Sequence, residues 1–288
     1  MSQKIQADQT AALLPYLVER LPDWSRTTLK QRLKAGCISV NGNTVKKHDF
    51  QVNSGDQLEI DAAPKSPEAR AHQLRSQPIE VLYQDHDLVA INKPAGLLSV
   101  STADDNKHNA LAILRHQLSR RDREIKLWPV HRLDRDTSGV LLFATSSEIR
   151  EAVIAKWAQA EKTYLAVVQG QPEQKSGTID QPLRLDEQFY FMHVGEHPDA
   201  KPAITHYQTA KTQKGRSLLH VQLETGRQHQ IRAHLAWLGH PVIGDPRYGQ
   251  GGDRLGLHAL RLKLVHPTSR IKLEFETPAP SDFLKLID

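Results

Sequence analysis

The sequence predicts an α+β protein with two domains: a small N-terminal α/β domain, and a larger domain built on a mixed, mostly antiparallel sheet with flanking helices. Strand and helix patterns mix along the chain, and the helices are too few to cross over between every pair of strands. A polar, proline-containing segment at residues 63–77 has the composition of a linker. The length of 288 residues also suits two domains.

The first predicted domain, residues 1–62, begins with two helices. Pro15 suits the first turn of one helix, because the first N–H groups of a helix have no partner within it. Ser25 is a good N-cap for the second helix, and Gly36 is expected to end it. Short strands follow over residues 37–40 and 58–60, and the Asn41-Gly42 pair between them is a strong signal for a hairpin turn.

The second of these helices carries a basic face. Its basic residues, with no acidic residue between them, are Arg26, Lys30, Arg32 and Lys34. One interpretation is an ordinary solvated helix face. The other is a face that contacts phosphates, which the formal net charge of +5 supports only weakly.

The second predicted domain, residues 78–288, mixes strands with a few helices. A Thr-x-x-Glu capping box at Thr145 and Glu148 is expected to begin one helix, and another is expected at about residues 229–238. The apolar face of the first of these consists of Ile149, Val153 and Trp157. The predicted strands cover residues 79–91 with a turn at 85–87, 140–143, 164–168, 219–223, 260–264 and 271–275.

Composition excludes several classes of protein. The single cysteine, Cys37, excludes an intrachain disulfide and a cysteine-rich metal cluster. No run approaches the roughly 18 apolar residues of a membrane span, and the polar N-terminus lacks the apolar stretch of a signal peptide. We therefore expect a cytoplasmic protein that does not enter a membrane.

One polar segment, His131–Gly139, is the strongest candidate for chemistry. It lies between a strand-like stretch and a buried apolar run, a position where loops display functional side chains. Asp134 has Arg132 and Arg135 as sequence neighbours, and nearby arginines favour an ionised carboxylate that can act as a nucleophile or a base. The alternative is that Asp134 or Asp136 only caps a turn.

A second segment, Gly226–Leu235, carries Arg227 at the start of a predicted helix and Arg232 one turn further on. Both are placed to face an anion. The alternative is an ordinary amphipathic helix, with its polar groups in water and three apolar residues buried: Ile231, Leu235 and Leu238.

No cofactor site is predicted. His229 and His234 are five residues apart, which does not present two metal ligands on one helical face, and no His-Glu-x-x-His occurs. No phosphate-binding Gly-x-x-x-x-Gly-Lys-Ser/Thr loop occurs either. We expect neither a metal nor a nucleotide cofactor.

The segment His131–Gly139 resembles the hallmark of the Rlu family of RNA pseudouridine synthases, which is His-Arg-Leu-Asp, two variable residues, then Thr-Ser-Gly. Four further motifs of that family are matched in the same order, so the resemblance covers roughly residues 78–288. They lie at 92–96 (Asn-Lys-Pro-Ala-Gly), 162–166 (Lys-Thr-Tyr-Leu-Ala), 226–235 continuing to 244–249, and 257–259 with 266–267. Departures occur after Gly96 and in the irregular segment 184–200.

The resemblance implies a reaction and a set of roles. Uridine becomes pseudouridine when the N1–C1′ bond breaks and C5 joins C1′, so the enzyme is an isomerase that needs no cofactor. Asp134 either attacks the sugar or abstracts a sugar proton, and Arg232 keeps it charged. Tyr164 stacks on the uracil, Arg132 fills the gap left by the flipped nucleotide, and Leu257 packs against the pocket wall.

Residues 11–60 resemble the alpha-L RNA-binding module of ribosomal proteins. The resemblance implies an RNA partner, with large-subunit ribosomal RNA as the first expectation and transfer RNA as the alternative. We expect a monomer. Two rival functions are a non-catalytic RNA-binding assembly factor and a metal hydrolase built on the histidines, which the histidine spacing opposes.

Overall fold

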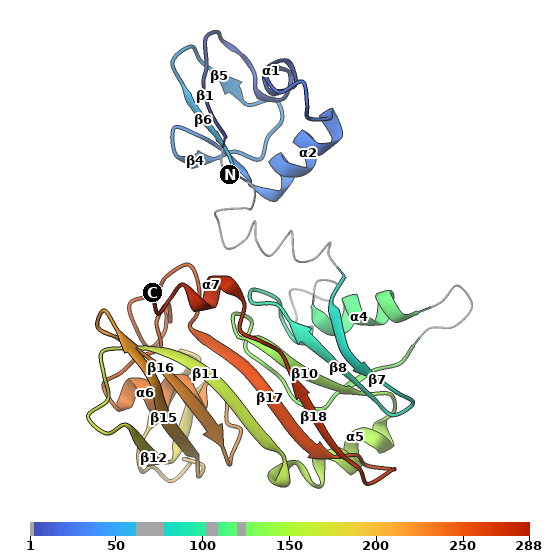
Figure 1. Ribbon diagram of the computed structural model, residues 1–288, viewed down its shortest axis with the longest axis vertical. Coiled ribbons are helices and arrows are strands. Elements are labelled where there is room, and N and C mark those ends of the chain that lie inside the picture. Colours follow the sequence, from blue (N-terminus) through green and yellow to red (C-terminus); the bar gives the residue numbers. More distant parts are fainter. Residues whose placement is uncertain (1–2, 62–77, 102–108, 120–124) are drawn as a thin grey trace. The chain divides into compact units, whose positions relative to one another are not determined.

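The computed structural model shows two compact units, Met1–Gln77 and Pro78–Asp288 (Figure 1). The structure describes residues 3–61, 78–101, 109–119 and 125–288. The expected linker at 63–77 therefore lies outside the described residues. In the described part of the chain, no helix is long and apolar enough to cross a membrane.

The first unit packs two helices against short strands. A four-stranded antiparallel sheet has the order β1-β6-β3-β4, and β2 pairs with β5. Its elements are β1 (Gln3–Gln6), β2 (Ala11–Ala12), α1 (Leu13–Arg20), α2 (Arg26–Ala35), β3 (Ile38–Val40), β4 (Asn43–Thr44), β5 (Gln51–Val52) and β6 (Gln57–Ile60).

The expected helix and turn signals of this unit are confirmed. The Ser25 side chain accepts the Thr28 N–H and caps α2, and Gly36 ends the helix in the left-handed conformation with φ 73°. Asn41 and Gly42 both have positive φ, 49° and 80°, as a two-residue type I′ turn requires. These residues join β3 to β4 in the predicted hairpin.

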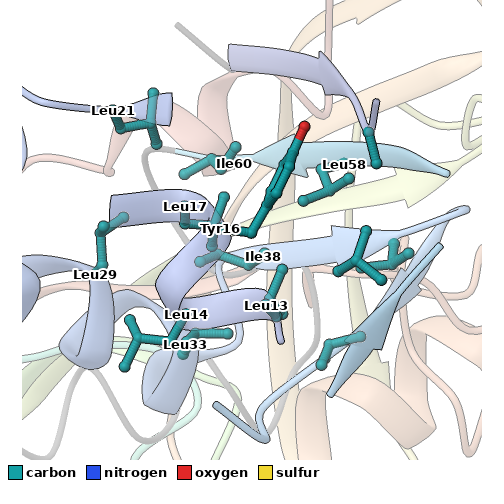
Figure 2. Close-up of a cluster of buried hydrophobic side chains, with 14 residues drawn as sticks. Leu13, Leu14, Tyr16, Leu17, Leu21, Leu29, Leu33, Ile38, Leu58 and Ile60 are labelled. Atoms are coloured by element: carbon teal, nitrogen blue, oxygen red, sulfur yellow. The ribbon is translucent and has the colours of Figure 1, made fainter. Parts of the chain in front are cut away.

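The two helices bury their apolar faces on the sheet (Figure 2). Leu17 of α1 and Leu29 of α2 are fully buried, as are Ile38 and Leu58 of the strands beneath them. Burying a leucine or isoleucine stabilises a fold by about 1.5–3 kcal/mol, so this cluster gives the unit a core of its own.

The second unit is built on a ten-stranded sheet. Eight strands follow the order β12-β15-β16-β11-β17-β10-β8-β7, with β18 paired to β17 and β9 to β10, while β13 and β14 form a separate hairpin. Its elements are β7 (Glu80–Gln84), β8 (Leu88–Lys93), α4 (Ala110–Leu118), β9 (Trp128–Pro129), β10 (Ser138–Ala144), α5 (Ser147–Ile154), the 3-10 turn η1 (Trp157–Gln159), β11 (Glu161–Gln169), β12 (Ser176–Asp180), β13 (Leu183–Asp186), β14 (Phe191–Val194), β15 (Ile204–Gln213), β16 (Arg216–Leu223), α6 (Gln230–Trp237), β17 (Leu257–Val265), β18 (Lys272–Glu276) and α7 (Ser281–Leu284).

The predicted mixed, mostly antiparallel sheet is confirmed. Among the described strands, β10 and β17 form the one parallel pair, near the middle of the sheet (Figure 1). Helices α4 and α6 contribute to two separate apolar clusters, and Tyr164 of β11 packs against both of them. The face of the sheet between these two clusters therefore carries Tyr164.

Two expectations for the helix after β10 are wrong. Ser146, not Thr145, caps α5 by accepting the Ile149 N–H, because the Thr145 hydroxyl donates to main-chain carbonyls of the turn after β7. The helix also ends at Ile154. Trp157 instead lies in η1, although its side chain packs in the same cluster as the α5 face.

Gly139 allows β10 and β17 to approach closely. It has φ 115° and lies opposite Ala259 in the parallel pair, and a Cβ built at Gly139 would lie 2.2 Å from the Ala259 carbonyl oxygen. On the other side of β17, the same Ala259 lies opposite Tyr164. Because residue 139 is glycine, β10 can lie directly beside β17. Only β17 then separates the segment before β10 from Tyr164 of β11.

Candidate active site

Asp134 lies in the segment between β9 and β10, with its side chain 28% exposed at the floor of a cleft. Arg232, in the first turn of α6, donates from Nη1 to Asp134 Oδ2 over 2.8 Å. This ion pair places a positive charge directly beside the carboxylate. The structure thus joins the two residues that the resemblance paired, across 98 positions of sequence.

Arg232 is itself fixed by a second carboxylate. Its Nε and Nη2 donate to the two oxygens of Asp245 over 2.7 and 2.9 Å, and the Asp245 side chain is fully buried. Burial acts to raise the pKa of Asp245, but the Arg232 guanidinium and the N–H groups of Arg247 and Tyr248 outweigh it and hold the pKa below its usual range. Arg232 therefore has one orientation, with Nη1 directed at Asp134.

Tyr164 faces Asp134 from β11. Burial and the nearby negative charge of Asp134 raise the pKa of the Tyr164 hydroxyl well above its usual range, so the phenol stays protonated at neutral pH. Its ring lines the cleft and packs on the two apolar clusters beneath. The three residues predicted as catalytic, Asp134, Tyr164 and Arg232, are thus neighbours.

The cleft has a volume of about 800 Å³ and a basic lining. Arg132 and Arg227 lie exposed on its walls, and the Arg227 Nε donates to the Pro202 carbonyl over 3.0 Å. The cationic side chains of the lining are Arg132, Arg135, Lys162, Arg227, Arg232 and Arg247, against two carboxylates, Asp134 and Asp136. Such a lining attracts a polyanion.

Leu257, expected to pack the pocket wall, does not itself line the cleft. Leu257 is buried in the apolar cluster beneath Tyr164, and Leu223 is among the residues that line the cleft instead. The reason is register: Leu257 lies opposite Ala166, two residues deeper along β11 than Tyr164.

The structure also corrects the expected partners of Asp134. Arg135 pairs with Asp136 over 3.2 Å and Arg132 is exposed, so the neighbours in sequence do not hold the carboxylate. The alternative role of Asp134 was to cap a turn with its side chain. A turn does form here, but its hydrogen bond is between main-chain groups, since the Thr137 N–H donates to the Asp134 carbonyl. The Asp134 side chain is left free to pair with Arg232.

The ordinary amphipathic helix is wrong for α6. Ile231 and Leu235 are buried as that alternative requires, but Arg232 and His234 are buried too, at 7% and 0% exposure. His234 is satisfied within the core by the Thr205 hydroxyl and the Gln181 carbonyl. The polar side chains of Arg232 and His234 therefore bond to other protein groups, in the site and in the core, and not to solvent.

Buried polar side chains hold the main chain around Asp134. Lys93 is fully buried, and its Nζ donates to three carbonyls, including that of Arg135 over 3.0 Å. Burial lowers the pKa of Lys93 to about 7. Ser99 bonds both the N–H and the carbonyl of Leu133, and Arg254 donates to the Asp136 carbonyl. These bonds fix the segment without occupying the Asp134 carboxylate.

His229 is a site residue that the sequence reasoning considered only as a metal ligand. It precedes α6 in a left-handed conformation, with φ 51°, and its Nε2 lies 3.8 Å from Asp134 Oδ2. The Tyr248 hydroxyl oxygen accepts the Met192 N–H and lies 3.1 Å from His229 Nδ1, within hydrogen-bond distance. Burial lowers the pKa of His229, which favours the neutral ring.

Within the residues that the structure describes, no group of three or more His, Cys, Asp or Glu side chains is arranged to hold a metal ion. The single cysteine, Cys37, is a buried thiol of the first unit, and burial raises its pKa.

Comparison with known proteins decides the family. The RNA pseudouridylate synthase profile matches residues 87–237, more than half of the chain and including Asp134, Tyr164 and Arg232. The chain belongs to the RNA pseudouridylate synthase family. It is therefore an isomerase that acts on uridine in RNA, as expected, and the non-catalytic and metal-hydrolase alternatives are set aside. The S4 domain profile matches residues 13–58, which confirms the RNA-binding module.

Relatives of this synthase cover its whole length. Ribosomal large subunit pseudouridine synthase D of Escherichia coli (strain K12) is 32% identical over 314 residues, covering 100% of this chain and 95% of the relative. The protein of the same name from Nitrosomonas europaea is 35% identical and covers 94% of this chain and 82% of the relative. The solved structure of Human RNA Pseudouridylate Synthase Domain Containing 4 has a TM-score of 0.60 at 26% identity, covering 76% of this chain and 95% of that chain.

Replacing Asp245 with Asn should lower the free energy of unfolding by about 3–5 kcal/mol at pH 7, because Arg232 loses a buried ionic partner. The pKa of Asp245 in the folded state is below its ordinary value of 3.8. The stabilisation from the ionised Asp245 is therefore fully present above pH 3.8 and is lost as the pH falls through the pKa of the folded state. Denaturant unfolding at pH 7 and at about pH 3 measures both stabilities. The difference between wild type and variant should be smaller at the lower pH.

The matched control is Asp136→Asn, which removes a carboxylate that is 40% exposed and paired only at the surface with Arg135. It should cost about 1 kcal/mol or less. An Asp245→Asn protein as stable as this control would contradict the buried bridge.

Proposed function

We propose that this isomerase converts uridine to pseudouridine in large-subunit ribosomal RNA, with Asp134 as its essential group. The observation that carries the chemistry is the Asp134 carboxylate, held by Arg232 beside Tyr164 in a basic cleft. The choice of ribosomal RNA is supported by the curated relatives, which share the full length of the chain. We infer a monomer in the cytoplasm, where ribosomes are made.

The reaction balances without any cofactor. The N1–C1′ bond breaks and leaves its electron pair on uracil, C1′ bonds to C5, the C5 proton is lost and N1 gains a proton. Asp134 either attacks C1′ to form an ester or removes a proton from the sugar to form a glycal. Both routes need an ionised carboxylate, which the Arg232 guanidinium favours.

The remaining cleft residues take distinct roles in this proposal. Tyr164 stacks on the freed uracil, and its high pKa keeps the hydroxyl as a hydrogen-bond donor. Arg132 is exposed on the wall of the cleft and fills the space of the flipped nucleotide, while Arg227 contacts a phosphate. His229 donates from Nε2 to the departing uracil, where negative charge develops.

Asp134→Asn should abolish tritium release from RNA labelled at C5 of uridine, because the amide is nearly isosteric but cannot act as an anionic nucleophile or base. Large-subunit ribosomal RNA should be the substrate for the wild type, and transfer RNA should release no tritium. The melting temperature should stay within a few degrees. Asp136→Asn, at the other carboxylate of the cleft, is the control and should keep near wild-type activity.

Two outcomes would contradict this assignment. Activity of Asp134→Asn within about tenfold of wild type corresponds to only ~1.4 kcal/mol of barrier and would exclude an essential carboxylate. Release from transfer RNA alone would keep the chemistry and overturn the proposed substrate.

His229→Phe should lower kcat about a hundredfold, the effect of losing one donor to developing charge, while the fold is kept. Tyr248→Phe should have a smaller effect, because His229 itself is kept and loses only the hydrogen bond at Nδ1. Single-turnover tritium release at saturating RNA measures both. An unchanged rate for His229→Phe would show that His229 has only a structural role.

The first unit is proposed to supply RNA affinity. Arg26, Lys30 and Lys34 are exposed at successive i, i+4 positions and so share one face of α2. Arg32 differs from the other three: its guanidinium lies 4.3 Å from the Trp24 ring centroid and donates to the Asp61 carbonyl. The exposed face of three cations is therefore the better test of phosphate contact.

Changing Arg26, Lys30 and Lys34 together to Gln should weaken RNA binding and make its salt dependence shallower. Each phosphate contact contributes about 0.9 to the slope of log affinity against log salt on duplex, so the slope should fall by about 2.7. The chemical rate at saturating RNA should not change. A control with equal charge loss replaces Lys4, Lys46 and Lys47, and equal effects in both triple variants would argue for net charge instead of this helix face.

A further inference from the structure

The β13–β14 hairpin exposes two aromatic rings at its tip. Phe189 is 66% exposed and Tyr190 is 62% exposed, the highest values among the large hydrophobic side chains of the described residues. The hairpin falls in the segment 184–200 that departs from the family pattern. Two large rings held in water are unfavourable by themselves and indicate a contact made with another molecule.

The tip is held by its main chain and not by packing of the rings. Asp186 accepts the N–H groups of Gln188 and Phe189, both over 3.1 Å. From the other side, Arg247 Nη1 donates to the carbonyls of Phe189 and Tyr190 over 2.5 and 2.6 Å. Tyr190 takes a left-handed conformation with φ 49°, which costs free energy in a residue other than glycine. The main chain from which the two rings project is therefore held in one conformation.

The hairpin is also tied directly to the active site. Arg247 lines the cleft, and its main-chain N–H donates to Asp245, the carboxylate that holds Arg232. The Phe191 ring lies 4.6 Å from the Tyr248 ring, whose hydroxyl binds His229. One side chain, Arg247, thus belongs both to the cleft and to the support of the tip.

We propose that Phe189 and Tyr190 form a stacking platform for unpaired bases that flank the target uridine. A uridine must leave its stack to reach Asp134, so the bases beside it also need a new surface. Each base offers a flat face that stacks on an aromatic ring whatever its sequence, and the cations of the adjacent cleft accommodate the phosphates. Two rings are too small for a stable protein interface, which buries at least ~1,200 Å² in total.

The test uses the full-length enzyme and the RNA from which the wild type releases tritium. Phe189→Ala and Tyr190→Ala should each raise the Kd for that RNA about tenfold, the effect of losing one stacked base. The kcat at saturating RNA should stay within about twofold, because neither ring touches the reacting atoms. Since both side chains are exposed, the melting temperatures should stay close to that of the wild type.

Conservative variants separate stacking from general apolar contact. Tyr190→Phe and Phe189→Trp keep a ring and should keep the wild-type affinity, while Phe189→Leu should bind as weakly as Phe189→Ala. The emission of the new tryptophan in Phe189→Trp should be quenched by RNA beyond the quenching seen in the wild type. Trp237→Ala is the control, since Trp237 is 53% exposed but lies at the end of α6 and not on the hairpin, and it should leave Kd unchanged.

Three results would overturn the platform. Unchanged affinity of the alanine variants for protein-free RNA would assign the rings to a protein contact instead. Full affinity of Phe189→Leu would show that only apolar contact matters, and equal weakening by Trp237→Ala would show that the effect is not local. The proposed ribosomal substrate is tested separately: if transfer RNA is the RNA that releases tritium, that proposal fails and the platform is tested on transfer RNA.

Discussion

The Arg232 guanidinium, held between two carboxylates, is the interaction on which the site depends. Asp245 takes Nε and Nη2 in the buried interior, and Asp134 takes Nη1 at the floor of the cleft. A buried arginine with one acid would leave part of its hydrogen-bonding capacity unsatisfied, and a buried acid without the arginine would become neutral. The accessible Asp134 carboxylate is thus bonded to Arg232, and the buried ion pair with Asp245 fixes the position of Arg232.

The position of Asp134 follows from the arrangement of strands beneath this bridge. Because Gly139 has no side chain, β10 lies close against β17, and Ala259 of β17 separates it from Tyr164 of β11. Lys93 then donates to the Arg135 carbonyl, and Ser99 bonds both the N–H and the carbonyl of the buried Leu133, in the segment before β10. The carboxylate is presented on a rigid base instead of a loop that must order when substrate binds.

The proposed contacts with RNA are distributed over separate parts of the chain. The cationic cleft and the aromatic tip at Phe189 and Tyr190 belong to the catalytic unit, while the exposed cations of α2 belong to the S4 domain, which has its own core. Charge contributes affinity without reading sequence, and stacking favours unpaired bases. A structured RNA with a locally open uridine satisfies both kinds of contact.

The sequence by itself determined features that depend on neighbours along the chain. Ser25, Gly36 and the Asn41-Gly42 turn are set by local backbone chemistry, and the α+β class follows from periodicity. The family motif around Asp134 is also local, and it identified Asp134 as the carboxylate that we propose to be reactive. The capping-box pattern nevertheless failed at Thr145, because its hydroxyl donates to the main-chain carbonyls of residues 86 and 87 instead of capping the helix.

Only the tertiary structure decided which side chains meet. The partner of Asp134 is 98 residues away and not one of the adjacent arginines. Leu257 lies in the core because of strand register, and His229 meets the Tyr248 hydroxyl through Nδ1. The exposed tip of the hairpin is fixed by Arg247, more than fifty residues further along the chain. Hydrogen bonds and ion pairs act over about 3 Å in space, whatever the separation in sequence, so a linear pattern cannot assign them.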